Sequence, residues 1–157
     1  MECFERMTQI HQEAEIEAPV EKVFAAIVDF RGYRHWLAPS TVFQGITDIS
    51  SGPIALGTTW SERGPNGVRR GTITEFEAPT RVTFHQPMTM NSRFLGTIDI
   101  TVSLALTPTP RSVQVRRVVT IGIPWPLKFV QPFVVRQFRA ESGRTLLALK
   151  RFAESSR

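Results

Sequence analysis

One basic residue stands on the apolar face of a predicted strand. The segment 112–122 carries apolar side chains at alternate positions, which are Val113, Val115, Val119 and Ile121. Residues two apart share one face of a strand, so Arg117 is predicted to point inward with them. A buried charge needs a partner because its desolvation costs several kcal/mol. Arg117 then holds either a carboxylate, phenolate or carbonyl of a ligand, or an internal partner such as Glu62 or Glu75. A bulge that turned Arg116 inward in its place is the third interpretation.

Two residues are candidates for moving a proton. Glu62 shares a strand face with Trp60, because they are two positions apart. His35 adjoins Trp36 in an aromatic segment between a predicted helix and the first of the following strands. Neither has a neighbour in the sequence that would tune its pKa for acid–base work. The histidines and the single cysteine lack metal-ligand spacing, so no metal site and no cofactor are expected.

The aromatic content points to a large core or an apolar pocket. The chain has eleven Phe and three Trp but only one Tyr, and such rings either fill an interior or line a cavity. The residues expected at a ligand are Arg117, Trp36, Trp60, Glu62, Phe84, Ile100, Phe138 and Ser142. Ser142 and Gly143 interrupt the apolar stripe of the last predicted helix. These small residues either leave room for a ligand or pack closely against an aromatic ring.

The elements that would position these residues follow from hydrophobic periodicity. Alternating residues predict a first strand over 9–17, and a helix-spaced pattern predicts a short helix over 19–29, followed by a turn or second short helix over 30–39. Six further strands are predicted over 42–49, 57–63, 69–77, 81–86, 94–106 and 112–122. Short turns between them indicate an antiparallel meander. A long helix over 132–155 closes the chain, with Pro132 ending a preceding short segment or bending the helix.

Five local motifs in this order resemble the START-like, or SRPBCC, superfamily near its polyketide cyclase/dehydrase group. They are IEAPVEKVF (16–24), YRHW (33–36), LGTTW (56–60), EAPTRV (77–82) and LLALK (146–150), and the resemblance spans nearly the whole chain. It implies an α+β helix-grip fold. In such a fold a curved antiparallel sheet of about seven strands grips a long C-terminal helix, and two short helices follow the first strand. An apolar cavity is then expected between sheet and helix, lined by residues such as Trp36, Trp60, Phe84, Ile100 and Phe138.

The resemblance leaves three classes of function open, because function lies in the pocket rather than in the fold. The first is binding or carriage of a small hydrophobic or amphipathic molecule, such as a lipid, polyketide or quinone-like compound. The second is a cyclase or dehydratase in which Arg117 stabilises an enolate and Glu62 or His35 moves the proton. The third is a protein-interaction module of the Hsp90-activator type. The first is favoured because no titratable cluster is evident, and the third is least favoured because the unusual residues are predicted inside.

Composition and charge bound the remaining properties. One domain over residues 1–157 is expected, with residues 1–7 as a loose N-terminal extension and Met7 as an alternative start. The net charge is +5, but the basic residues are scattered, so no nucleic-acid partner is predicted. The lone Cys3 and the absence of an apolar leader predict a cytoplasmic protein. The apolar segment 118–135 is broken by prolines, which argues against a transmembrane span but leaves a peripheral membrane contact open. The oligomeric state is not predicted.

Overall fold

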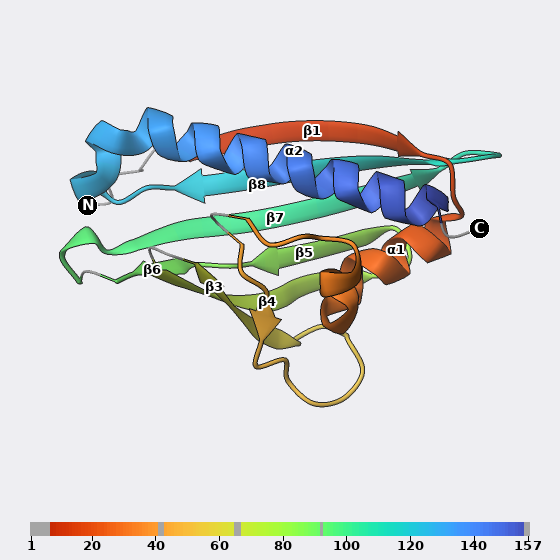
Figure 1. The fold of residues 1–157 in the computed structure, drawn as a ribbon, viewed down its shortest axis with the longest axis horizontal. Coiled ribbons are helices and arrows are strands. Elements are labelled where there is room, and N and C mark those ends of the chain that lie inside the picture. The colour runs from red at the N-terminus through yellow and green to blue at the C-terminus, as the bar shows by residue number, and fades with distance from the viewer. Residues whose placement is uncertain (1–6, 41–42, 65–66, 92, 156–157) are drawn as a thin grey trace.

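The computed structural model forms one antiparallel sheet with a long helix laid along it (Figure 1), and it describes residues 7–155 except 41–42, 65–66 and 92. The strands in this part of the chain are β1 (Thr8–Ile16), β2 (Ile46–Thr47), β3 (Thr59–Gly64), β4 (Gly67–Glu77), β5 (Arg81–His85), β6 (Met88–Met90), β7 (Thr97–Pro108) and β8 (Val113–Gly122). The helices are α1 (Val20–Val28) and α2 (Gln131–Ser155), with short 3-10 turns η1 (Phe30–His35), η2 (Arg93–Leu95) and η3 (Trp125–Val130).

The sheet is a meander whose first and last strands are neighbours. Its order is β1-β8-β7-β5-β4-β3-β2, and β6 pairs with β4 and β7. Helix α2 runs along one face of the sheet and packs against β1 in particular (Figure 1). Helix α1 and η1 cover the same face near the C-terminal end of α2. Alternation is clearest in β7, an interior strand whose inward residues from Ile98 to Leu106 are all buried. This arrangement confirms the predicted helix-grip fold.

Helix α2 follows directly from the apolar spacing of the sequence. Leu146, Leu149 and Ala153 recur every three or four residues and are fully buried against the sheet. Pro132 lies in the first turn of the helix, where its missing N–H would have no partner in any case. The short segment that the sequence places before Pro132 is η3, which ends one residue before α2 begins.

Three predicted segments need correction. The segment 42–49 was expected to be a strand, but within its described residues only Ile46–Thr47 pairs, with β3. Conversely, Met88–Met90 was expected in a loop, yet it forms β6 between β4 and β7. A three-residue strand is too short for alternation to show in a sequence. The predicted strand 94–106 also begins later, because residues 93–95 form η2.

The N-terminal extension lies largely outside the described residues, which begin at Met7. Met7 itself packs against the end of β8, because a Cβ added at Gly122 would lie 2.7 Å from the Met7 sulfur. Among the described helices, none is both long and apolar enough to cross a membrane.

Candidate ligand-binding site

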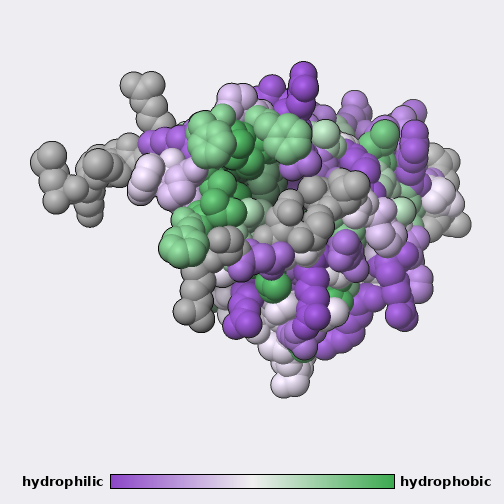
Figure 2. All heavy atoms as spheres, turned by 60° about the vertical axis from the view of Figure 1, so that its left-hand side comes forward, coloured by the Kyte–Doolittle hydropathy of each residue, from purple (hydrophilic) through white to green (hydrophobic). Residues whose placement is uncertain are grey.

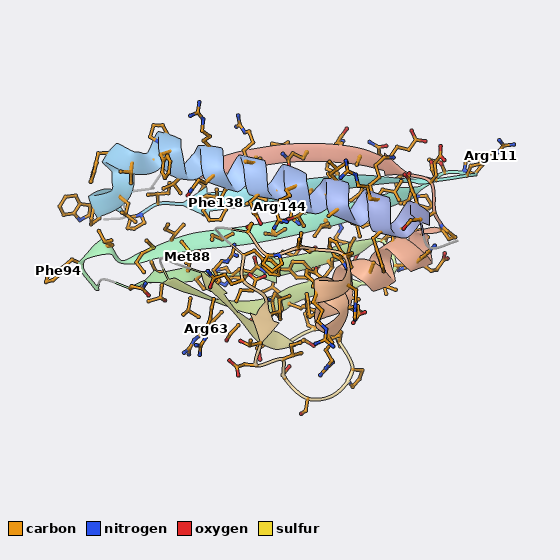
Figure 3. The ribbon with its side chains drawn as sticks, in the orientation of Figure 1. Arg63, Met88, Phe94, Arg111, Phe138 and Arg144 are labelled. Carbon is orange, nitrogen blue, oxygen red and sulfur yellow. The ribbon has the colours of Figure 1, made fainter. Side chains whose placement is uncertain are left out.

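Two adjoining cavities lie between the sheet and the first half of α2. The outer one has a volume of about 250 Å³ and walls that are mostly apolar, with Met88, Met90, Ile98, Val134 and Phe138 among them. The inner one has a volume of about 60 Å³ and a lining that is about half polar, with Tyr33, Glu62, Gln86 and Arg117 among its polar residues. Arg69 and Glu141 line both, so they mark the boundary. Figure 3 shows Phe138 reaching from α2 toward the sheet, where Met88 lies opposite.

Arg117 lines the inner cavity from the inward face of β8. The β8 ladder with β1 and β7 is unbroken, so alternation holds and the alternative of a bulge is wrong. The neighbouring Arg116 lies on the outer face, where its Nε is 2.9 Å from Glu13 Oε1. The Nε of Arg117 donates to Ser142 Oγ at 2.8 Å. Among the described residues, no carboxylate forms an ion pair with Arg117, and the bond to Ser142 is its one side-chain hydrogen bond within this part of the chain. The Arg117 side chain lines the inner cavity.

Glu62 is buried opposite a different arginine. It pairs in register with Arg69 across the β3–β4 hairpin, and Arg69 Nε lies 3.3 Å from Glu62 Oε2. The Arg69 side chain is 12% exposed and the Glu62 side chain is 8% exposed. The contact is close enough for an ion pair, but it is not aligned as a hydrogen bond, because Glu62 Oε2 has no hydrogen-bond partner. Glu75, the other acid considered for Arg117, lies elsewhere: it accepts a hydrogen bond from the Thr83 hydroxyl at 3.0 Å on the outer face.

Burial dominates the protonation of the inner groups. It raises the pKa of Glu62 above its ordinary value, and Arg69 and Arg117 offset only part of that rise. Burial also raises the pKa of Tyr33, so the phenol is neutral and donates its proton to the Ile27 carbonyl. The pKa of Arg117 is lowered by burial, although Tyr33 and Glu62 counteract this; a guanidinium still keeps its charge. The inner cavity therefore combines a fixed cation with a carboxyl that takes up a proton readily.

Glu141 closes the inner cavity from α2 and already has its own partners. Arg144 donates to it twice, from Nε to Oε2 at 3.2 Å and from a terminal nitrogen to Oε1 at 2.6 Å. The Ser40 hydroxyl donates to Oε1 at 3.0 Å. Arg144 is itself anchored by the Ala38 carbonyl at 2.7 Å. The charge of Glu141 is thus compensated by Arg144. Of the two arginines that line the inner cavity, Arg69 pairs with Glu62, and Arg117 has no ion-paired carboxylate among the described residues.

Trp60 and Phe84 form the floor of the inner cavity. Trp60 stacks on Phe30 with ring centroids 4.2 Å apart, and Phe84 meets it edge-on at 5.4 Å. The indole lies flat across Gly71, its partner on β4, where an added Cβ would be only 2.3 Å from the ring. Gly71 is therefore the residue that allows the tryptophan to occupy this position.

Of the other residues expected to line the site, one lies at the outer cavity and the rest lie at neither cavity. Phe138 lines the outer cavity. Ser142 is buried and holds Arg117 rather than facing either space. Ile100 is packed in the core at 1% exposure, because its strand position faces the interior away from both cavities. Trp36 also lies elsewhere: it shares a surface groove with His35 and stacks on Phe152. The predicted lining is thus corrected for Ile100 and Trp36.

The geometry does not support the roles considered for His35 and Gly143. His35 is exposed and lies outside both cavities, so it has no route to a group held by Arg117. Gly143 lines neither of the two cavities but a surface pocket beside β1, where an added Cβ would be 3.3 Å from the Gln12 side-chain nitrogen. Within the described residues, no cluster of three or more His, Cys, Asp or Glu side chains could hold a metal ion.

The residues of the inner cavity that the sequence interpretation missed include the polar groups of Tyr33, Arg69, Gln86 and Glu141. Arg69 could have been found, because a hairpin with its turn at residues 64–67 places it opposite Glu62. Glu141 stands three residues before Arg144, a helical pairing that is visible in the sequence. Gln86 could also have been found, because it lies two positions after Phe84 in the predicted strand 81–86. Tyr33 lies in the short turn η1, where periodicity assigns no face.

Comparison with known proteins is decisive for the family. Residues 7–154 match the family model described as polyketide cyclase / dehydrase and lipid transport. The chain belongs to this family. No curated protein matches it significantly.

Solved structures similar to this family member share its fold at low sequence identity. A protein from Mesorhizobium loti has a TM-score of 0.71 at 15% identity, with 96% of this chain and 99% of that chain covered. The Aha1 dimer from Colwellia psychrerythraea has a TM-score of 0.65 at 20% identity, covering 94% and 96%. Norcoclaurine synthase from Thalictrum flavum, in complex with dopamine and hydroxybenzaldehyde, has a TM-score of 0.69 at 14% identity, covering 96% and 88%. These similarities show that the fold is shared.

Proposed function

We propose that the protein binds and carries a small amphipathic molecule whose polar oxygen is held by Arg117. The observation that carries this proposal is the apolar cavity of about 250 Å³ beside a polar one of about 60 Å³. Ligand pockets usually combine apolar walls with a few polar groups that fix orientation. Together the cavities come to the lower end of the roughly 300–1,000 Å³ typical of such pockets. This size favours a compact lipid, polyketide or quinone-like molecule.

Arg117 is suited to be the anchor because its neighbours leave its cavity side unoccupied. Ser142 fixes the guanidinium through Nε, and the terminal nitrogens can then meet a carboxylate, phenolate or carbonyl. Glu62 lies against Arg69, and Glu141 is held by Arg144. A guanidinium oriented in advance loses little entropy when a ligand arrives. A bound anion would also compensate a charge that is now buried without an ion-paired carboxylate among the described residues.

The comparisons support this proposal at the level of the fold. The family description includes lipid transport. The norcoclaurine synthase structure holds two small aromatic molecules, dopamine and hydroxybenzaldehyde. A fold of this kind can therefore accommodate a compact aromatic ligand, and the ligand class for this chain follows from its own lining.

A cavity-filling variant tests the proposal. Val134 lines the outer cavity, and Leu147 is an exposed residue on the opposite side of the same helix. We expect Val134→Phe to weaken binding of the fluorescent probe naphthoic acid by about tenfold or more, because added ring volume occupies the space for the probe. Leu147→Phe is the matched control and should bind as the wild type does. Equal binding by all three proteins would contradict the proposal, and so would wild-type protein that binds no probe and retains no small molecule in native mass spectrometry after purification from its own host.

A second candidate function is proton transfer of the cyclase or dehydratase type. The observation that favours it is Glu62, a buried carboxyl of raised pKa that lies at the inner cavity with Arg117. Glu62 would take a proton from a carbon next to a carbonyl, while Arg117 would stabilise the enolate oxygen. Glu62→Gln should then abolish turnover of an aromatic poly-β-ketone while naphthoic acid binding persists. Wild-type protein that binds such a compound and leaves it unchanged would exclude this function.

A further inference from the structure

Four large aromatic side chains project into solvent at one end of the molecule. Phe94 is 91% exposed, Trp125 78%, Phe129 82% and Phe133 60%. We call these residues the aromatic tip. Figure 2 shows apolar side chains gathered on this face, while most of the surface around them is polar. Single exposed apolar residues are ordinary, but a contiguous group of large rings marks an interaction site.

The tip is assembled from separate parts of the chain. Phe94 belongs to η2, and Trp125 and Phe129 belong to η3, which leads directly into α2 with Phe133. The two turns touch: a Cβ added at Gly96 would lie 3.5 Å from the Pro124 ring. In Figure 3, Phe94 points away from the body of the protein. The contact between these two segments therefore holds the rings in their outward positions.

Positive charge surrounds the tip. The sequence contains no Asp or Glu between Asp99 and Glu141, so η3 and the first turns of α2 are free of acidic residues. Lys128 lies between Trp125 and Phe129 along η3, and Arg136 and Arg139 follow on α2; all three are exposed. Aromatic rings flanked by cations match the interface of an anionic bilayer, where the rings enter the headgroup region and the cations meet lipid phosphates.

The charge argues against a second copy of the chain as the occupant. A two-fold contact places the same patch on both partners. Lys128 and the α2 arginines of one copy would then face their equivalents, and like charges at an interface are costly. A membrane surface supplies negative charge over a wide area without that repulsion.

The tip also adjoins the outer cavity. Phe133 belongs to both, and Leu127 and Val130 line the cavity from the same turn. We propose that the aromatic tip inserts into the interface of an anionic bilayer, which places the edge of the outer cavity at the membrane surface. A lipid-soluble molecule can then pass between bilayer and cavity without crossing water. This last consequence rests on the proposed function, whereas the membrane contact itself does not.

Vesicle flotation tests the proposal with two sets of variants. The vesicles are phosphatidylcholine alone and phosphatidylcholine mixed with phosphatidylglycerol. The double variant Trp125→Ser, Phe129→Ser should bind both kinds at least about tenfold more weakly, because two interfacial rings are lost. The control Leu56→Ser alters another exposed apolar residue, which is 68% exposed in the loop between β2 and β3, and should bind as the wild type does. All six positions altered in these variants and in those of the next paragraph are exposed, so folding should persist.

The charge variants address the lipid preference. The double variant Lys128→Glu, Arg136→Glu should lose the preference for phosphatidylglycerol, since the tip would then repel anionic lipid. Arg111→Glu is the control, because Arg111 lies at the opposite end of the molecule (Figure 3). Retained preference in the double variant would overturn the proposal.

Other outcomes also contradict the membrane contact. Wild-type protein that floats with neither vesicle, or serine variants that bind as the wild type does, would overturn it. A dimer seen by light scattering that the serine variants abolish, without vesicle binding, would assign the tip to a contact between copies. Naphthoic acid uptake is measured on the same proteins without lipid. If the wild type takes up naphthoic acid but binds no vesicles, the membrane contact is refuted and the carrier function stands. If the wild type binds vesicles but takes up no naphthoic acid, the carrier function is refuted and the membrane contact stands.

Discussion

The two halves of α2 meet the sheet in different ways. Every fully buried residue of the helix lies between Ser142 and Ala153, where Leu146 and Leu149 belong to the core. The preceding half, from Gln131 to Glu141, has no fully buried residue and lies over the two cavities instead. One helix therefore closes the core with its second half and leaves ligand-sized space beneath its first. Stability and binding should respond to substitutions in different halves.

The largest effect is expected where packing is solid. Leu149→Ala should lower the free energy of unfolding by about 2–5 kcal/mol, because a buried leucine leaves a cavity when truncated. Val134→Ala removes two carbons rather than three, at a residue that already borders open space, and should cost less than about 1 kcal/mol. Urea denaturation of both variants measures the difference. Similar losses for the two would show that the helix is packed uniformly.

Adding one methyl group at each of two glycines, Gly71 beneath Trp60 and Gly143 in α2, tests the same difference in packing. Gly71→Ala should destabilise the protein by about 1–3 kcal/mol, because the new Cβ would overlap the Trp60 indole at 2.3 Å. Gly143→Ala has only the end of the flexible Gln12 side chain within 3.3 Å. It should be neutral or stabilising by up to about 1 kcal/mol, since alanine is the better helix former. Thermal unfolding of both variants is the measurement, and an equal loss at the two sites would contradict the role given to Gly71.

The inner cavity should also make stability depend on pH. Because the pKa of Glu62 is raised in the folded state, folding takes up a proton between the ordinary value of 4.5 and the folded value. This contribution is fully present below 4.5 and is lost as the pH rises through the folded pKa. We expect the stability of the wild type relative to Glu62→Gln to fall over that range, by at most about 1.4 kcal/mol per pH unit.

Urea midpoints of wild type and Glu62→Gln across the acidic to neutral range provide the test. Other carboxyl groups titrate in both proteins, so the difference between the two isolates Glu62. Glu75→Gln is the control, because that acid lies on the outer face with Thr83. A wild-type advantage that grows with pH would have the wrong sign and would place Glu62 in a favourable ion pair instead.

Much of this architecture was predictable because the strands alternate. The unbroken register of β8 is why a period-two pattern placed Arg117 inward and Arg116 outward. The long C-terminal helix followed from apolar spacing alone. Family motifs added the grip of sheet on helix, which periodicity by itself does not specify.

The parts that failed share a physical reason. Trp36 follows a 3-10 turn, and a residue in such a position has no periodic neighbours to assign its face. Ile100 was placed correctly inward, but an inward residue can meet either a cavity or its packed neighbours. The division of the space between α2 and the sheet into two cavities depends on the distance of the helix from the sheet along its length. No local sequence pattern encodes that distance.

The central claim is that Arg117 anchors an oxygen of the ligand, and one measurement tests it most directly. Affinities of naphthoic acid and of ethylnaphthalene, which has a similar shape without the carboxylate, are compared for wild type, Arg117→Met and Arg116→Met. We predict that Arg117→Met weakens naphthoic acid binding by about tenfold or more, as loss of a charge-assisted hydrogen bond requires. Ethylnaphthalene should bind all three proteins alike, and Arg116→Met should behave as the wild type. Equal binding of both probes by wild type and Arg117→Met would contradict the account.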